Sequence, residues 1–434
     1  PNRGFDRAHL RRSATSARQL VTGSGFMRCR HCGERVGLVL VDLGSSPPSN
    51  SYLTDEDLRS PETWFPLRVL VCETCWLVQT EDFADAADLF DADYAYFSGF
   101  SSTWLEHCRT YADEVTERFC LDRSSRVIEV ASNDGTLLNF FHMRGMKCTG
   151  IEPTASTAAA ARDLGLEVRE VFLDDESAED LAADGLVADL LVANNVLAHV
   201  PDIVGFTAGC RRLLAADGVA SFEFHHLVEL VSKTLFDTIY HEHFSYLSLT
   251  SVEAVFKTAG LKVSDVEQLS THGGSLRVYA QRAESTRFDT CESVFRLRDE
   301  EASLGVASPA FYAGFQERSD RTKDDLMRFL VDAKREGRQL VGYGAAAKGN
   351  TLLNYAGVRP DLMAYVVDNN PAKQGMYLPG SRIPIVDEQR IVDDPPDIVL
   401  VLPWNIRDEV AQRLGSLNGW LGTVVTAVPE LRVG

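Results

Sequence analysis

Residues 236–246 place four chemically active side chains in consecutive positions, namely Tyr240, His241, Glu242 and His243. A histidine titrates near neutral pH and can remove a proton, a neighbouring carboxylate can orient it, and a phenol can donate to a developing oxyanion. The stretch therefore favours acid–base catalysis. A His-x-His metal pair is an alternative, although the sequence shows no further ligands at a fitting spacing. A surface cluster of histidines is the third interpretation.

A strand-turn-helix pattern at residues 127–136 carries acids where a nucleotide site carries glycines. A strand that breaks into a tight turn before a helix is where α/β sheets bind nucleotides. Here the turn has only Gly135 instead of Gly-x-Gly-x-x-Gly, and it contains Glu129 and Asp134. A cationic cofactor without phosphate fits, and S-adenosylmethionine has a sulfonium, an aminoacyl tail and a ribose diol. An ordinary turn without a ligand is the alternative.

Two later strands end in further polar residues. Glu152 follows the second strand, and its two acceptor oxygens suit the ribose hydroxyls, while Asp134 and the turn amides suit the aminoacyl group. The strand at 188–193 ends in two amides and then His199, and polar groups at a strand's carboxyl end line the crevice of such sheets. We assign Asn195 to the substrate. The expected cofactor residues are Glu129, Ser132, Asn133, Asp134, Gly135, Glu152 and Asn194.

Four of the nine cysteines form two Cys-x-x-Cys pairs, Cys29 with Cys32 and Cys72 with Cys75. Tetrahedral Zn²⁺ takes four thiolates at about 2.3 Å, and a closed four-thiolate shell leaves no position for catalysis, so we predict a structural zinc site. Two unrelated pairs of buried thiols are the alternative. The prolines between the pairs predict loop rather than packed core. The five other cysteines stand singly, and we expect them in the core.

The elements that position these residues alternate between strands and helices. Strands are expected at 126–130, 148–151, 167–171, 188–193 and 218–224, with a final hairpin at 261–266 and 275–279. Helical spans between such strands predict a parallel sheet covered by helices. Residues 103–119 have a helical pattern, and residues 284–337 predict a helical hairpin. A second α/β unit is expected to start at 339–343 and to continue through 364–368 and 397–402.

The C-terminal unit opens with a second glycine-rich turn at residues 341–350. Amides at the start of its helix suit a pyrophosphate, and Lys348 supplies charge. We predict that Lys348 and Asn350 bind the phosphates of a substrate. A bound NAD is the alternative, since Asp368 after the next strand is compatible with ribose binding or with capping a helix.

Composition excludes several classes of partner. With 43 Lys and Arg against 63 Asp and Glu, the net charge is −20, which argues against binding nucleic acid or an anionic membrane. No run approaches 18 apolar residues, so no membrane span is predicted. The first 25 residues are basic but lack the apolar stretch of a secretory signal, so we expect an N-terminal extension and a reducing, cytoplasmic location.

Six segments together resemble one known family. They are the paired Cys-x-x-Cys, Ser-Asn-Asp-Gly-Thr-Leu-Leu138, Ala-Asn-Asn-Val-Leu-Ala-His-Val-Pro201, Phe-Asp-Thr-Ile-Tyr-His-Glu-His-Phe244, Thr-His-Gly-Gly-Ser-Leu-Arg-Val-Tyr279 and Gly-Tyr-Gly-Ala-Ala-Ala-Lys-Gly-Asn-Thr351. In this order, and over nearly the whole chain, the set resembles the zinc-containing sugar C-methyltransferases of antibiotic deoxysugar pathways. Ala131 stands where relatives often have glycine.

The resemblance implies an α/β protein in three parts. A basic tail (1–25) precedes a small zinc domain (26–100), a Rossmann-like S-adenosylmethionine domain (101–283), and a helical linker with a C-terminal Rossmann-like domain (284–434). The implied substrate is a nucleotide-linked 4-keto-deoxysugar, expected as the dTDP form, that is methylated on a carbon beside the ketone. C-3 is expected and C-5 is the alternative. An amino sugar and a hydroxy sugar are both compatible with the sequence, and the oligomeric state is open.

The resemblance also implies roles for individual residues. The family's catalytic histidine falls on His243 and its tyrosine on Tyr240, with Glu242 and His199 in the same site. A tyrosine of the substrate pocket falls on Tyr94 or Tyr96. Chemistry agrees with these roles, because a C–H bond beside a ketone becomes acidic once its conjugate base spreads charge onto oxygen. Positioned acid–base groups contribute about 10²- to 10⁴-fold.

Three other functions fit parts of the sequence. An RNA methyltransferase with a zinc ribbon conflicts with the net charge of −20 and with the lack of a basic stripe. A non-catalytic S-adenosylmethionine sensor leaves the residues at 240–243 without a role. An O- or N-methyltransferase is the nearest alternative, and the new bond in the product distinguishes it.

Overall fold

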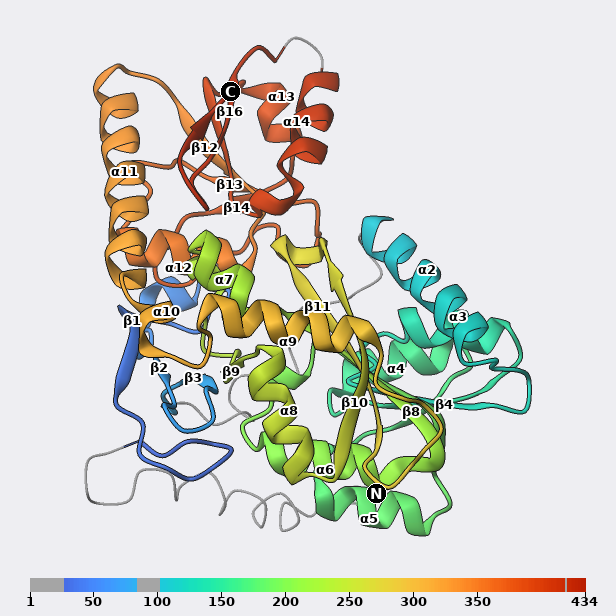
Figure 1. Ribbon diagram of the computed structural model, residues 1–434. Coiled ribbons are helices and arrows are strands. Elements are labelled where there is room, and N and C mark those ends of the chain that lie inside the picture. Colours follow the sequence, from blue (N-terminus) through green and yellow to red (C-terminus); the bar gives the residue numbers. More distant parts are fainter. Residues whose placement is uncertain (1–26, 84–101, 418–419) are drawn as a thin grey trace.

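The computed structural model describes residues 27–83, 102–417 and 420–434, which form three sheets flanked by helices (Figure 1). The predicted basic tail (1–25) and the two tyrosines Tyr94 and Tyr96 lie outside the described residues. No helix of the described residues is both long and apolar enough to cross a membrane.

The N-terminal sheet has the order β1-β2-β3-β9, and its neighbouring strands are antiparallel. Its strands are β1 (Leu38–Ser46), β2 (Phe65–Val71), β3 (Val78–Thr80) and β9 (Ser245–Tyr246). The expectation of a loop between the cysteine pairs was therefore wrong. Strands β1 and β2 lie between the cysteine pairs, and their apolar residues, such as Val41 and Val69, are fully buried. Three of the four prolines lie in the connection between β1 and β2. The prolines marked only that connection.

The central sheet has seven strands in the order β10-β11-β8-β7-β4-β5-β6. They are β4 (Arg126–Val130), β5 (Lys147–Ile151), β6 (Glu167–Arg169), β7 (Ala188–Asn194), β8 (Leu214–His225), β10 (Leu261–Leu269) and β11 (Ser275–Arg282). Strands β4 to β8 pair in parallel, and β11 is antiparallel to both β8 and β10. Because β4 lies between β5 and β7, its carboxyl end is the switch point where open α/β sheets bind ligands.

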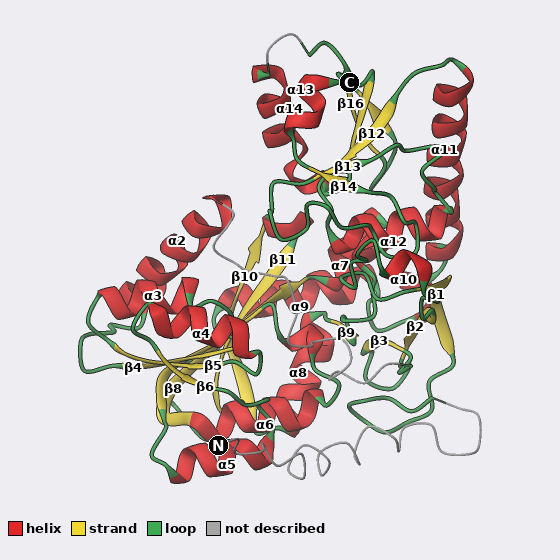
Figure 2. Cartoon of the chain, turned by 180° about the vertical axis from the view of Figure 1, so that it is seen from behind, coloured by secondary structure: helices red, strands yellow, loops and turns green. Residues whose placement is uncertain are grey.

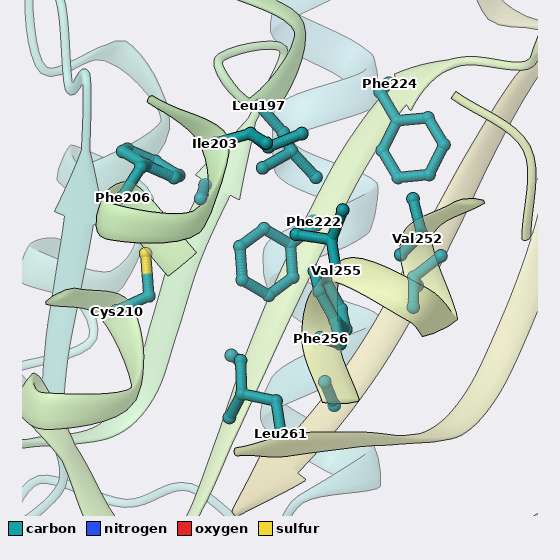
Figure 3. Packing of buried hydrophobic residues seen from close by; sticks show 14 of the residues in the cluster. Leu197, Ile203, Phe206, Cys210, Phe222, Phe224, Val252, Val255, Phe256 and Leu261 are labelled. Carbon is teal, nitrogen blue, oxygen red and sulfur yellow. The ribbon is translucent and has the colours of Figure 1, made fainter. Parts of the chain in front are cut away.

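Helices cover both faces of this sheet (Figure 2). One face packs against α2 (Ser102–Arg118), α3 (Thr136–Met143) and α4 (Ala155–Asp163). The other packs against α5 (Asp175–Ala183), α6 (Ile203–Leu213), α8 (Leu249–Thr258) and α9 (Glu292–Leu304). Neighbouring residues such as Leu190 and Leu191 enter opposite cores because strand side chains alternate between faces. On the second face, the rings of Phe222 and Phe256 lie 4.8 Å apart (Figure 3).

The C-terminal sheet has the order β14-β13-β12-β15-β16-β17 and is parallel except for β17. Its strands are β12 (Leu340–Tyr343), β13 (Val366–Val367), β14 (Ile385–Val386), β15 (Ile398–Val401), β16 (Thr423–Thr426) and β17 (Arg432–Val433), with helices α11 (Phe315–Arg335), α12 (Ala347–Ala356), α13 (Gln389–Asp393) and α14 (Arg407–Ser416). Strand β12 lies between β13 and β15, which makes its carboxyl end a second switch point.

One buried core joins the N-terminal sheet to the C-terminal unit. It contains Val41 and Val69 of the N-terminal sheet, Leu230 of α7 (Leu227–Lys233), and Leu352 of α12. Figures 1 and 2 both show α12 beside α7 where the units meet. Between the central and C-terminal sheets, α9 packs into the central core, and α10 (Pro309–Tyr312) and α11 follow. The three units therefore share packed interfaces rather than being joined only by the chain.

The expectation that all five single cysteines are core residues was partly wrong. Cys108 and Cys210 are buried, and Cys148 is half-buried. Cys120 and Cys291 are exposed. Cys120 has a left-handed backbone (φ 54°) immediately after α2, and Cys291 precedes α9, so both lie at helix ends rather than on a buried face.

The turn after β4 depends on left-handed backbone at Ala131 (φ 55°), Asn133 (φ 51°) and Gly135 (φ 77°). Ala131 keeps this conformation despite its side chain. Gly135 has a second constraint, because a Cβ there would lie 2.4 Å from Leu166 Cδ1. The missing side chain allows α3 to begin close against the core.

We predict that Gly135→Ala lowers the free energy of unfolding by about 2–4 kcal/mol, since it combines left-handed strain with overpacking. Gly185→Ala is the control, because Gly185 has a similar φ of 85° but nothing within 4 Å of the added Cβ. Its cost should be about 1–2 kcal/mol. Urea denaturation measures both, and equal losses would contradict the close approach.

Candidate active site and metal centre

The four N-terminal cysteines converge on one point. Their Sγ atoms all lie within 4.8 Å of one another, and the pairs Cys29–Cys75 and Cys32–Cys72 are 3.5 Å apart. A tetrahedral Zn–S bond of about 2.3 Å requires sulfur atoms ~3.8 Å apart. The cysteine cluster therefore fits a four-thiolate metal, and hydrogen bonds from the Cys29 and Cys75 thiols lower the pKa of Cys72.

Each cysteine pair lies in a tight turn of the same design. The amide of Gly33 donates to the Cys29 carbonyl at 3.0 Å, and the amide of Trp76 donates to the Cys72 carbonyl at 2.8 Å. Both donors have left-handed backbone, with φ of 72° at Gly33 and 60° at Trp76. The Trp76 ring stacks on Tyr312 of α10 at 6.2 Å, which anchors the second turn to the segment before the C-terminal unit.

The predicted cofactor residues meet at the carboxyl ends of β4, β5 and β7. Burial raises the pKa of Glu129 well above its usual value. Glu152 accepts from the amides of Asn133 and Thr154, each at 2.9 Å, so it braces the turn. Asp134 accepts from the amide and hydroxyl of Thr136 at the start of α3.

Three buried polar atoms around this turn lack a hydrogen-bond partner within the described part of the chain. They are Glu129 Oε2, Ser132 Oγ and Asn194 Oδ1. A buried polar atom is costly unless it is paired. Three such atoms at one switch point therefore fit a polar ligand with hydrogen-bond donors. The absence of a Cβ at Gly150 leaves room for the Ser132 side chain, since that Cβ would lie 2.4 Å from Ser132 Oγ.

The catalytic stretch leads into β9 and lies against the end of β7. The rings of Tyr240 and His243 are 4.0 Å apart, and those of His199 and His243 are 4.6 Å apart. Asn195, in left-handed backbone at φ 54°, follows β7 on the same edge, and its amide donates to the Glu223 carbonyl at 2.6 Å. The structure thus brings Tyr240, His243 and His199 together.

The imidazole of His243 has a fixed orientation. Its Nδ1 lies 2.9 Å from the Thr238 carbonyl, so Nδ1 carries the hydrogen and Nε2 is the nitrogen that can accept a proton. Burial lowers the pKa of His243 well below its usual value, and the neighbouring His199 lowers it further. Burial also lowers the pKa of His199 to about 4. Both imidazoles are therefore neutral at pH 7, as a base requires.

Glu242 is buried and bonds to the N-terminal unit. Its side chain is 1% exposed, and Oε1 accepts from Asn50 Nδ2 at 3.2 Å. Asn50 follows β1, so the N-terminal unit supplies this partner. Burial raises the pKa of Glu242 to about 7.

His241 does not combine with His243. Its Nε2 lies 3.2 Å from the Pro66 carbonyl in β2, and its ring packs edge-on against Phe65. Within residues 27–83, 102–417 and 420–434, the cysteine cluster is the one group of His, Cys, Asp and Glu side chains close enough to hold a metal. The His-x-His metal alternative therefore receives no support.

Lys348, at the start of α12, contacts Trp404 and Asn405 of its own unit. Its Nζ lies 4.8 Å above the Trp404 ring and donates to Asn405 Oδ1 at 2.8 Å. Burial lowers the pKa of Lys348, and the charge of Asp237 opposes this shift. The charge of Lys348 lowers the pKa of His225 and His243, so the ammonium and these rings occupy one region.

Asn350 and Asp368, the other C-terminal candidates, bond to the protein itself. Asn350 is buried and donates to the Ser49 carbonyl at 2.6 Å. Asp368 accepts from the amides of Ala345 and Asn370 at 2.7 and 2.8 Å. Lys348 is therefore the C-terminal candidate that the structure brings to the catalytic stretch.

Sequence reasoning missed Asn50, Asp237, Trp404 and a buried network on the central sheet. In that network Glu223 lies 3.0 Å from His107 Nε2 and accepts from Arg277 Nη2 at 2.8 Å. These contacts lower the pKa of Glu223 against the effect of its burial. Two of these residues could have been found from the sequence, because Asp237 lies within the catalytic stretch and Glu223 lies near the carboxyl end of a predicted strand. No local signal marked Asn50 or Trp404, because their partners lie far away in sequence.

The central strand order and the acidic turn at its switch point define an S-adenosylmethionine-dependent methyltransferase. Comparison with known families agrees. Residues 104–266 match the family described as "Methyltransferase domain", residues 270–429 match "C-methyltransferase C-terminal domain", and residues 29–90 match "Putative zinc binding domain".

The similarity extends along the chain to a curated relative. The C-methyltransferase NovU of Streptomyces niveus is 35% identical over 405 residues, which cover 93% of this chain and 96% of NovU. The chain therefore belongs to this C-methyltransferase family and is an S-adenosylmethionine-dependent C-methyltransferase. The family resemblance and the α/β fold class expected from the sequence are confirmed.

Solved structures resemble smaller parts of the chain. The magnesium protoporphyrin IX methyltransferase of Synechocystis PCC 6803, with bound SAH, is 13% identical with a TM-score of 0.34, covering 41% of this chain and 83% of its own. The PH0226 protein of Pyrococcus horikoshii OT3 is 14% identical with a TM-score of 0.35, covering 46% of this chain and 100% of its own.

The buried Glu242 predicts a specific dependence of stability on pH. Its pKa is about 7 in the fold against an ordinary 4.5, so its favourable contribution is full below about pH 4.5 and is lost as pH rises through 7. We expect Glu242→Gln to remove about 2.5 kcal/mol of the fall in unfolding free energy between pH 5 and pH 8.

Denaturant unfolding at several pH values measures this difference. Glu117→Gln, which changes an exposed glutamate, is the control and should follow the wild-type curve. Parallel curves for wild type and Glu242→Gln would show that burial does not hold the proton on Glu242.

Proposed function

We propose that the protein methylates a nucleoside-diphosphate 4-keto-deoxysugar, in the dTDP form, at C-3 beside the ketone, in antibiotic deoxysugar biosynthesis. The orientation of His243 carries the proposal, because a neutral, half-buried imidazole with Nε2 available suits removal of a carbon acid's proton. The C-methyltransferase family supports it, since forming a new C–C bond requires such a carbanion.

In the proposed reaction His243 Nε2 takes the proton from the carbon beside the ketone, and the electron pair moves onto the carbonyl oxygen. Tyr240 donates a hydrogen bond to that oxygen, and the 4.0 Å spacing of the two rings allows both to reach one substrate. His199 packs against His243 and limits its movement. S-adenosylmethionine, when bound, supplies the electrophilic methyl group that the carbon receives.

The residues around β4 fit that cofactor. Glu129, Ser132 and Asn194 offer buried acceptors without partners in the described ranges, and Asn133, Asp134 and Gly135 form the turn between them. Both oxygens of Glu152 accept hydrogen bonds from backbone amides. We assign their remaining lone pairs to the ribose hydroxyls of the cofactor. We propose that the units predicted from the sequence (26–100, 101–283 and 284–434) are also the functional units, and that residues 101–283 bind the methyl donor.

The substrate's diphosphate is assigned to Lys348. The charge of Lys348 lowers the pKa of His243, and Lys348 lies at the start of α12, beside the C-terminal switch point. Asn350 is buried in the same helix, and a direct phosphate contact would require Asn350 to give up its hydrogen bond to the Ser49 carbonyl. Asn195 is assigned to the sugar side of the crevice. Tyr94 and Tyr96 stay candidates for the sugar pocket.

A direct test is incubation with a panel of nucleotide 4-keto sugars and S-adenosylmethionine labelled in its methyl group. We expect one sugar nucleotide to gain a methyl on C-3, located by NMR. Methylation at an oxygen or nitrogen, or of no panel member, would contradict the proposal.

We predict that His243→Gln slows the exchange of the sugar's α-proton with solvent at least about 10²-fold. Binding of S-adenosylmethionine should persist, because His243 is not among the proposed cofactor residues. His241→Gln is the matched control, since it changes a neighbouring buried histidine that bonds to Pro66, and it should exchange like wild type. Normal exchange by His243→Gln would disprove the assignment of the base.

We also propose that the cysteine cluster holds one structural Zn²⁺. Metal analysis should find about one zinc per chain, and Cys72→Ser should lose it and lower the unfolding temperature. Cys120→Ser changes an exposed cysteine outside the cluster and should keep the metal. A protein that folds equally well after complete zinc removal would contradict a structural role.

A further inference from the structure

The carbonyl that orients His243 belongs to a short turn, η6 (Phe236–Thr238), at the start of the catalytic stretch. Thr238 supplies this carbonyl, at 2.9 Å from His243 Nδ1. Any rotation of this peptide would remove the acceptor and release the imidazole. What holds the turn therefore also holds His243.

The C-terminal unit bonds to the residues on both sides of Thr238. On one side, Trp404 Nε1 donates to Asp237 Oδ2 at 2.8 Å. On the other, Thr351 Oγ1 donates to the Ile239 carbonyl at 2.8 Å. Trp404 follows β15 and Thr351 lies in α12, so two separate elements of one unit fix the peptide between them.

These contacts are buried, which makes them costly to break. Asp237, Thr238 and Ile239 are at most 6% exposed, and so is Thr351. Asp237 Oδ1 has no hydrogen-bond partner among the described residues, so loss of the Trp404 bond would remove the side-chain hydrogen bond that this buried carboxylate accepts at Oδ2.

Trp404 is itself held against the central unit. A Cβ on Gly273 would lie 2.2 Å from Trp404 Cη2, so the glycine in the turn between β10 and β11 makes room for the indole. The ammonium of Lys348 lies over the same ring. Trp404 therefore contacts both Lys348, which we propose binds the diphosphate, and Asp237 in the turn that orients the base.

We propose that Trp404 and Thr351 are positioning residues, through which the C-terminal unit fixes the Thr238 carbonyl and so the imidazole of His243. The inference rests on the proposed role of His243 as the base. It gives the C-terminal unit a part in the proton-transfer step in addition to substrate binding, although neither side chain touches the reacting atoms.

The first test needs no substrate. Trp404→Phe keeps a ring beside Gly273 but removes the indole N–H, and Thr351→Val removes the hydroxyl at nearly constant shape. In protein labelled with ¹⁵N-histidine, and with His243 assigned by its loss in His243→Gln, wild type should show the Nδ1–H tautomer. Both variants should show a mixture of tautomers at His243.

Two controls separate positioning from general damage. Trp420→Phe removes an indole N–H bond to the Pro396 carbonyl elsewhere in the same unit and should leave His243 unchanged. Thr351→Ser keeps the hydroxyl and should restore the wild-type tautomer. A wild-type His243 signal in both Trp404→Phe and Thr351→Val would overturn the proposal. If one of them fails to fold, the other decides.

The second test uses the sugar nucleotide that wild type methylates. We expect each variant to lower kcat about 10- to 100-fold with KM within about twofold, since misplacement of a base affects the chemical step. A raised KM with unchanged kcat would overturn the positioning role and leave Trp404 as a support for Lys348. Lack of turnover by wild type on every panel member would instead count against the proposed function, while the tautomer result would still stand.

Discussion

The hydrogen bonding of residues 236–246 is the constraint on which the rest of the structure depends. This catalytic stretch is almost entirely buried yet has little regular structure of its own, so its polar groups need partners from elsewhere. The N-terminal and C-terminal units supply several of them. Asn50 of the N-terminal unit donates to Glu242, Trp404 and Thr351 of the C-terminal unit bond to the turn, and β9 completes the N-terminal sheet. The site exists only where the three units meet.

The charged and titratable groups around this stretch differ from the acidic composition of the whole chain. The protein carries a net charge of −20, yet an ammonium and three histidines with lowered pKa values gather at the junction, namely Lys348, His199, His225 and His243. Burial keeps the imidazoles neutral, and Lys348 adds to that effect. The ammonium of Lys348 can therefore accept an anionic group within an acidic protein, which the global charge alone would not suggest.

Much of the central unit was predictable because its signals are local. The strand expected at 126–130 is β4 with the same bounds, and the helix expected near Thr136 begins there. Apolar runs that end in Asn194 or Glu152 mark the carboxyl edge of a parallel sheet, where a site is expected. The N-terminal unit was predicted less well, since prolines in one connection hid the alternating apolar residues of β1 and β2. The exposed Cys120 and Cys291 were misjudged because a single cysteine carries no pattern.

The sequence by itself determined the chemistry that is available. Residue types, the spacing of the cysteine pairs and the order of the strand ends are local properties, and they specified the fold class and the metal cluster, whereas the family resemblance implied that Tyr240, His243 and His199 share one site. Only the tertiary structure decided which of these groups meet and how each is oriented. It turned Glu242 toward Asn50, buried Asn350 beneath the site and placed Trp404 against Asp237. Such contacts join residues more than 150 positions apart, and no periodicity along the chain encodes them.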